Sequence, residues 1–271
     1  MAQPLKRIIR RAAFEARRFP VGVKDRMLAA LGEEFKFQRG MISMEASLAN
    51  LRRNGFDPAT IIDVGAFQGD WSRMARRIYP HAAICMLDAN PEKEPLLSAA
   101  TREIGEAEYH IALLGPEPAA SRPFYVMGTG SSVLPENTSM PRSVAQLPMT
   151  TLDHTLAQKP KPQPYFLKLD VQGYELEVLR GAELVLANTE AALLEVSLME
   201  YNQGAPLFAE VVAFMHARDF VVYDVSGLYR RESDHALFRM VTLFVRESSP
   251  LRSRKRFWNW EAEVSMAPAL R

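Results

Sequence analysis

The chain has 271 residues, of which 48% are hydrophobic and 24% charged, so a collagen-like repeat and a long disordered chain are excluded. A single cysteine, Cys85, excludes a disulfide framework and any zinc site built from several cysteines. The net charge of +1 conceals two basic ends: residues 1–40 hold ten Lys or Arg against four Asp or Glu, residues 246–271 hold six against three, and the body between them is acidic.

The first predicted element is a basic helix over residues 5–19, in which Leu5, Ile8 and Ala12 recur at helical spacing among arginines. Such a helix either packs on the main domain or lies on an anionic membrane surface. No stretch approaches the roughly 18 apolar residues of a membrane span, and no apolar segment typical of a secretory signal follows the N-terminal charges. We therefore expect a cytoplasmic protein, with peripheral contact to the inner face of the membrane as an alternative role for this helix.

An alternation of strands and helices follows. The pattern predicts helices over 43–54, 70–78, from Pro91 onward, 174–186 and 206–217, and strands over 60–64, 83–87, 109–114, 165–169, 191–196, 220–223 and 240–245. The stretch 116–150 is rich in Pro, Gly and Ser, and we expect it to be irregular except for a strand at 124–126. Strands that alternate with helices of about a dozen residues indicate βαβ units and a parallel sheet.

The predicted fold is therefore α/β: a Rossmann-like, doubly wound, mostly parallel seven-stranded sheet with a C-terminal antiparallel hairpin. The predicted organisation is a basic helical extension over 1–40, one catalytic domain over 41–248, and a basic aromatic tail over 249–271.

Polar residues follow the carboxyl ends of four predicted strands, where doubly wound sheets bind their ligands. These residues are Asp63, Gly65, Ala66, Gln68 and Gly69 after the first strand, Asp88 and Ala89 after the second, Asp170 after the fourth, and Glu195 near the end of the fifth. Four carboxylates are thus predicted to lie around one crevice.

This acidic crevice distinguishes between ligand classes. A dinucleotide needs a G-x-G-x-x-G turn whose N–H groups bind phosphate, but Phe67 stands in place of the second glycine, and carboxylates repel phosphate. S-adenosylmethionine has a sulfonium, an ammonium group and a ribose diol, which carboxylates suit. Asp88 lies 23 residues after Gly65, near the offset of about 20 expected for an acid that binds ribose. Alternatively, Asp63 and Asp88 cap the helices that follow them.

At these residues the chain resembles the FkbM-type methyltransferases. The resemblance rests on Ile62-Asp63-Val64-Gly65-Ala66, on Asp88-Ala89-Asn90-Pro91, and above all on the block from Phe166 to Ala182 that reads FLKLDVQGYELEVLRGA. It covers residues 57–246 and implies the class I methyltransferase fold. It also implies methyl transfer from S-adenosylmethionine, usually to a hydroxyl of a sugar, glycolipid or natural product. Two positions depart from the family: Phe67, where Asn is frequent, and Gln172, where many members have Glu.

The catalytic candidates are Asp170, Lys168 and Glu195. Asp170 ends the central strand and is our first choice for the base that takes the proton of the acceptor hydroxyl. Lys168 is two residues earlier, faces the same way, and could pair with Asp170 or Glu195. Asp170 and Glu195 could also hold a divalent cation, but two carboxylates are too few to establish a metal site, and no metal is expected.

The candidates for acceptor binding are Ser131, Glu175, Arg230 and His235. Ser131 belongs to a small polar segment, 128–132, that also resembles the family and is otherwise a flexible turn. Glu175 could instead be a favourable charge at a helix N-terminus. Arg230 and His235 share the loop of the predicted hairpin, which could equally be a solvated tip, and His235 is a second candidate for the base.

The expected partner is a small-molecule, saccharide or lipid-linked acceptor. Trp258 and Trp260 lie among basic residues in the tail, a pattern found in nucleic-acid and membrane-interface segments and in tails that cover an apolar patch. Nucleic acid is not expected, because the body is acidic and the basic residues avoid the crevice. The alternatives to a methyltransferase are an NAD-type Rossmann oxidoreductase and a catalytically silent methyltransferase-like binding protein.

Overall fold

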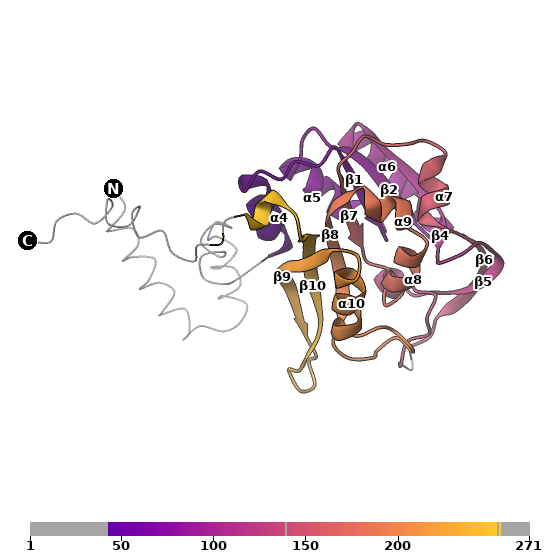
Figure 1. Cartoon of the computed structure of the whole chain (residues 1–271). Coiled ribbons are helices and arrows are strands. Elements are labelled where there is room, and N and C mark those ends of the chain that lie inside the picture. Colours follow the sequence, from indigo (N-terminus) through magenta and orange to yellow (C-terminus); the bar gives the residue numbers. More distant parts are fainter. Residues whose placement is uncertain (1–42, 139, 254, 256–271) are drawn as a thin grey trace, which may run out of the picture.

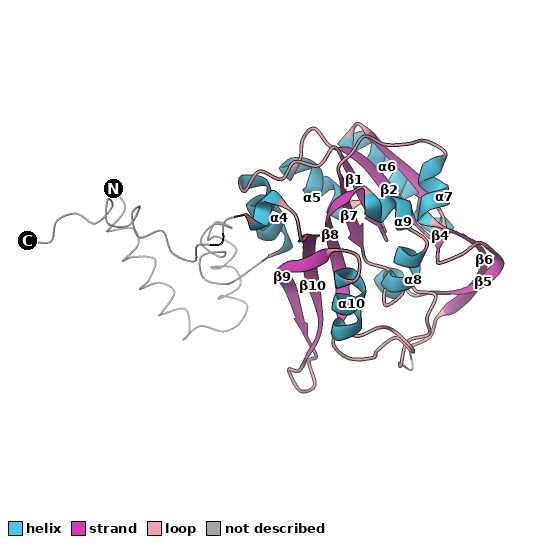
Figure 2. Ribbon diagram, viewed as in Figure 1, coloured by secondary structure: helices cyan, strands magenta, loops and turns pink. Residues whose placement is uncertain are grey.

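The computed structural model describes residues 43–138, 140–253 and 255 (Figure 1). In this part of the chain, a large sheet covered by helices carries a smaller sheet at one side, formed around the strands β5 and β6 (Figure 2). The predicted helix over 5–19 and the tryptophans of the tail lie outside the described residues. No helix within them combines the length and the apolar character that crossing a membrane requires.

The main sheet has seven strands. Their spatial order is β3 (Ala107–Ile111), β2 (Ala83–Asp88), β1 (Thr60–Val64), β7 (Tyr165–Leu169), β8 (Thr189–Ser197), β10 (Leu237–Arg246) and β9 (Phe220–Arg230). The first five are parallel, and β10 runs antiparallel to both β8 and β9. The predicted doubly wound sheet with its C-terminal antiparallel hairpin is confirmed. The strand order reverses between β1 and β7, and such a switch point is where these sheets bind ligands.

Helices cover both faces of this sheet (Figure 1). One face packs on α4 (Met44–Arg53), α5 (Asp70–Ile78) and α6 (Glu94–Ile104), and the other on α7 (Leu152–Ala157), α8 (Glu175–Arg180), α9 (Glu183–Ala187) and α10 (Phe208–His216). Short 3-10 turns lie at Pro91–Lys93, Gly128–Gly130 and Pro250–Arg252. Because side chains alternate along a strand, Ile61 and Ile62 of β1 belong to opposite cores, and all five residues of β1 are buried.

The prediction for residues 109–150 was wrong in part. The third strand ends at Ile111, and Leu113–Leu114 is a separate strand, β4, of a second sheet with the order β4-β6-β5. Its other strands, β5 (Ala119–Val126) and β6 (Ser143–Thr150), are antiparallel and take up nearly half of the stretch expected to be irregular. The strand predicted at 124–126 lies within β5. Both strands are half exposed and carry prolines, so local apolar alternation is weak, and their pairing across a long connection decides the structure.

The predicted helix 174–186 is two helices, α8 and α9, which are separated at Gly181. A Cβ atom at Gly181 would lie 2.2 Å from the carbonyl oxygen of Gly115, so the backbone just after β4 passes directly against this position. The close approach explains why a glycine interrupts the helix here.

Candidate active site

A cavity of about 260 Å³ lies at the carboxyl ends of β1, β2 and β7, between the main sheet and the second sheet. The predicted residues that line it are Gly65, Ala66, Gln68, Asp88, Ala89, Ser131, Lys168 and Asp170. The predicted residues that do not line it are Asp63, Gly69, Glu175, Glu195, Arg230 and His235. The structure therefore brings most of the predicted cofactor residues together with Asp170.

The turn after β1 is held against the ends of both neighbouring strands. Gly65 has φ +76°, and a Cβ atom there would lie 1.9 Å from the carbonyl oxygen of Asp170, so only glycine fits. Phe67 has φ +53°, a conformation that favours glycine, and its N–H donates to Asp88 Oδ2 at 2.8 Å. These contacts fix the position of the turn relative to Asp88 and Asp170.

Asp88 lines the cavity at the end of β2, and its two oxygens accept hydrogen bonds from the N–H groups of Phe67 and, at 2.9 Å, Asn90. Burial raises the pKa of this carboxyl group. These contacts fix the loop around Asp88 but do not cap a helix: the 3-10 turn after β2 is capped by Asn90, and α5 begins after Gly69 without a side-chain cap, so the alternative that Asp63 and Asp88 are helix caps was wrong. Each carboxylate oxygen has a second lone pair, which leaves Asp88 able to accept from a bound hydroxyl.

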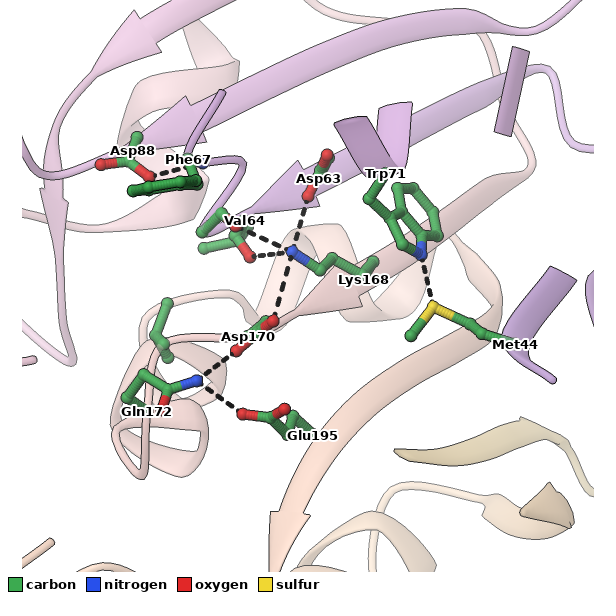
Figure 3. Close-up of polar contacts among 12 residues, drawn as sticks. Met44, Asp63, Val64, Phe67, Trp71, Asp88, Lys168, Asp170, Gln172 and Glu195 are labelled. Carbon is green, nitrogen blue, oxygen red and sulfur yellow. Dashed lines mark hydrogen bonds and ion pairs between the residues drawn. The ribbon is translucent and has the colours of Figure 1, made fainter. Parts of the chain in front are cut away.

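Lys168 forms a buried ion pair beneath the cavity with Asp63, at 2.9 Å (Figure 3). Its Nζ also donates to the carbonyl oxygen of Gly65 at 2.9 Å, and Asp63 Oδ2 accepts from Ser72 Oγ at 2.7 Å. Burial opposes the charge of Lys168, but the attraction of Asp63 and Asp170 outweighs it and raises the pKa. Asp63 is fully buried, so the structure places it below the cavity rather than in its wall, where a cofactor residue was expected.

Asp170 is the carboxylate of the β7 end that reaches the cavity, with its side chain 36% exposed. Lys168 lies 4.0 Å from Asp170 Oδ2, farther than it lies from Asp63. Gln172 Nε2 lies 2.6 Å from both Asp170 Oδ1 and Glu195 Oε2 (Figure 3). Glu195 is almost buried and pairs with Arg239 at 3.1 Å, and burial together with the charge of Asp170 raises its pKa.

The structure places Glu175 and the hairpin residues away from the cavity wall. Glu175 Oε1 accepts from the N–H groups of Val171 and Gly173 at 3.0 and 3.2 Å, so it braces the turn after β7, and burial raises its pKa to about 7. Arg230 and His235 are exposed at the β9–β10 loop, where an Arg230 N–H donates to the carbonyl oxygen of His235 at 3.0 Å. Both β9 and β10 extend beyond their predicted ends, so this loop lies away from the cavity and is exposed to solvent.

Sequence reasoning missed three aromatic side chains of the cavity wall: Trp71, Phe124 and Tyr174. Trp71 lies in the first turn of α5, and its Nε1–H donates to Met44 Sδ at 2.8 Å, which joins α4 to the cavity (Figure 3). Trp71 also packs on Phe166 of β7, with ring centroids 6.0 Å apart. The position of Trp71, two residues after Gly69, could have indicated that it lies near the glycine turn. The position of Phe124 in the cavity wall could be known only from the second sheet.

Among the described residues, ligand atoms spaced for a metal occur together at Cys85, Glu108 and His110, away from the cavity. Glu108 forms ion pairs with Lys159, at 2.9 Å, and with Lys161. These ion pairs hold the pKa of Glu108 at about 2 against the opposing effect of burial. Each oxygen of the Glu108 carboxylate is paired with an ammonium group, so we assign the cluster to the packing of the 159–164 loop against β3.

The profile of the Methyltransferase FkbM domain matches residues 63–222, which is more than half of the chain. The chain belongs to this family. The matched segment begins at Asp63 in β1 and ends in β9, so it contains the ends of β1, β2 and β7 at which the cavity lies. The seven-stranded sheet is accordingly the Rossmann-like fold of class I methyltransferases.

Solved structures with a similar fold include three methyltransferase-related proteins, each with a TM-score of 0.44. Methyltransferase FkbM from Methylobacillus flagellatus KT is 14% identical, with 68% of this chain and 43% of that chain covered. An O-methyltransferase family protein from Burkholderia thailandensis is 11% identical, with 76% and 56% covered. TrmK from M. capricolum, in complex with S-adenosyl-homocysteine, is 7% identical, with 76% and 69% covered. Comparison with curated proteins gave no match.

Proposed function

We propose that this FkbM-family protein is an S-adenosylmethionine-dependent O-methyltransferase that acts on a hydroxyl group of a saccharide, glycolipid or natural product. The observation that supports this most is one cavity with Asp88 at the end of β2 and Asp170 at the end of β7. The first carboxylate suits a ribose diol, and the second suits a hydroxyl that must lose a proton.

The residues of the cavity fit the cofactor. Asp88 would accept hydrogen bonds from the ribose hydroxyls, and the tight Gly65–Ala66 turn lets the ligand approach the backbone closely. When bound, S-adenosylmethionine would supply an activated methyl group to the acceptor oxygen while its sulfur keeps the electron pair of the broken bond. The aromatic and apolar wall, including Trp71 and Tyr174, would exclude water from this transfer.

Asp170 would hold the acceptor hydroxyl and take up its proton. It reaches the cavity, whereas Glu195 is tied to Arg239 and His235 lies on the exposed loop, so neither alternative base lines the cavity. Most of the rate enhancement in such a transfer comes from holding the oxygen in line with the methyl group, and a positioned base contributes about 10²–10⁴-fold more.

Calorimetry and a transfer assay test this proposal. The full chain should bind S-adenosylmethionine and not NAD, and it should transfer labelled methyl groups in a screen of saccharides, glycolipids and hydroxylated natural products. Binding of NAD instead would favour the oxidoreductase alternative, and binding of S-adenosylmethionine without any turnover would favour the silent binding protein. Co-sedimentation with anionic vesicles at low salt tests whether the basic N-terminal segment brings the protein to a lipid-linked acceptor.

Asp170→Asn tests the role of the base. We expect turnover to fall by about 10²–10⁴-fold while S-adenosylmethionine affinity stays within a few-fold of the wild type. Asp57→Asn is the matched control, because Asp57 is exposed and precedes β1 at the opposite end of the strand from the cavity. Wild-type turnover in Asp170→Asn would mean that this residue is not the base.

A further inference from the structure

The side-chain amide of Gln172 lies between two carboxylates. Gln172 is buried, and its Nε2 lies 2.6 Å from Asp170 Oδ1 and 2.6 Å from Glu195 Oε2 (Figure 3). An amide nitrogen carries two protons, so it can donate one to each carboxylate. The two acids, which come from the ends of neighbouring strands β7 and β8, are thereby joined through one neutral group.

The orientation of this amide follows from its other contacts. Gln172 Oε1 lies 3.4 Å from a guanidinium nitrogen of Arg239 and 3.5 Å from the hydroxyl of Tyr201, both of which donate. The flipped amide would turn its oxygen toward two carboxylates and its protons toward a guanidinium group. Both changes are unfavourable, so the network itself assigns the two ends of the amide.

The backbone holds Gln172 in an unusual conformation to make these contacts. Its φ is +55°, which residues with a side chain rarely adopt outside functional or tightly constrained turns. The Gln172 carbonyl oxygen accepts from Ser132 Oγ at 2.9 Å and from Asn202 Nδ2 at 2.5 Å. The turn is therefore held by the connection between β5 and β6 on one side and by the loop after β8 on the other.

Two carboxylates held this close usually need a shared proton or a cation between them. Here Gln172 supplies protons to both, and Arg239 pairs with Glu195 through two nitrogens, each at 3.1 Å. Asp170 Oδ1 is occupied by the amide, which leaves Oδ2 for a substrate in the cavity.

We propose that Gln172 is a positioning residue that takes the place of a divalent cation between Asp170 and Glu195, so that Asp170 is held ready to accept a proton without a metal. This inference rests on the proposed role of Asp170. It assigns a specific consequence to the glutamine: the site does not bind a divalent cation because the amide fills the position that the cation would occupy.

Gln172→Glu tests the inference without a large change of shape, because it brings a third carboxylate against the other two. The full-length variant should gain binding of Mn²⁺. A tenfold excess of MnCl2 over the dissociation constant should then raise its thermal midpoint by roughly 3–6 °C. The wild type should show no rise. Gln203→Glu, which adds the same charge on an exposed neighbouring loop, should also show none. Adding Glu195→Gln to Gln172→Glu removes one ligand and should abolish most of the gain.

Turnover provides a readout that a purely structural role would not change. Wild-type turnover should be insensitive to EDTA. In Gln172→Glu, kcat should fall about tenfold or more, and Mn²⁺ should partly restore it. In Gln172→Met, kcat should fall by a similar factor, and Mn²⁺ should not restore it. The KM for the acceptor should change little in either variant.

Three results would overturn the inference: a Mn²⁺-dependent rise in the wild-type midpoint equal to that of Gln172→Glu, loss of wild-type turnover with EDTA, or no gain of Mn²⁺ binding by Gln172→Glu. Failure of the proposed function is distinguishable from these. If Asp170→Asn turns over normally while the Mn²⁺ results come out as expected, Asp170 is not the base and the placement of Gln172 stands.

Discussion

Lys168 and Asp63 form an ion pair beneath the cavity, and Lys168→Met removes one partner while keeping an apolar stem of similar length. At 2.9 Å and an effective dielectric constant of about 20, the attraction between the charges is about 6 kcal/mol. Burial of the two charges offsets much of this, since both side chains are at most 6% exposed. The variant leaves the Asp63 carboxylate buried, and within the described part of the chain only the Ser72 hydroxyl then donates to it. We expect a loss of about 3–5 kcal/mol in the free energy of unfolding, out of a total of about 5–15 kcal/mol.

Urea unfolding of the full chain measures this loss. The midpoint should fall without a change in the slope, and the difference from the wild type should narrow between pH 8 and pH 5, because an unpaired buried carboxylate can take up a proton. Adding Asp63→Leu should recover most of the loss. Lys159→Met is the control, because Lys159 is 75% exposed and its pair with Glu108 should contribute less than about 1 kcal/mol. If Lys168→Met unfolds within about 1 kcal/mol of the wild type, the pair does not support the cavity floor.

Three further predictions follow from the cavity and its supports. Asp88→Ala should weaken S-adenosylmethionine binding by roughly ten- to a hundredfold in calorimetry, since a charge-assisted hydrogen bond contributes about 1.5–3 kcal/mol, and unchanged affinity in a folded variant would refute the ribose contact. Gly65→Ala should lose at least about 1–2 kcal/mol in urea unfolding and also weaken cofactor binding, because its φ is +76° and its Cβ would lie 1.9 Å from the Asp170 carbonyl oxygen; wild-type values for both would contradict the close approach. The pKa of Glu175 is raised to about 7 from a usual 4.5, so the folded protein holds a proton that the unfolded chain has lost, and stability should fall as the pH rises from about 5 to 7. Glu175→Gln should flatten this part of the urea-midpoint profile, and an unaltered profile would assign the dependence to another group.

Local sequence patterns were sufficient for the elements of the main sheet. The helix predicted over 70–78 has those limits in the structure, and the strands predicted over 60–64 and 165–169 also have theirs. Apolar runs of this length between glycines, prolines and capping residues are local signals, because they reflect which residues can be buried on both faces of a parallel sheet. The position of the cavity followed from the same signals, since the strand order of a doubly wound sheet places its switch point at the ends of the first and fourth parallel strands.

The second sheet was beyond local pattern. Strands β5 and β6 are separated by a long connection, are half exposed, and contain Pro123 and Pro148. Their hydrogen bonds form between segments that are distant in the chain, and local alternation predicted only the short strand at 124–126, which lies within β5. The place of Phe124 in the cavity wall was missed because it depends on the pairing of β5 with β6.

The sequence by itself determined the class of the fold, the edge of the sheet at which the cavity lies, and the residue types at that edge. The tertiary structure decided which charged side chains form pairs. The period of two along a strand placed Lys168 and Asp170 on one face, but the parallel register of β1 and β7 puts Lys168 beside Asp63, and the turn after β7 brings Gln172 between Asp170 and Glu195. Side-chain periodicity reports the face on which a residue lies, whereas its partner depends on hydrogen bonds between strands that are about a hundred residues apart in the sequence.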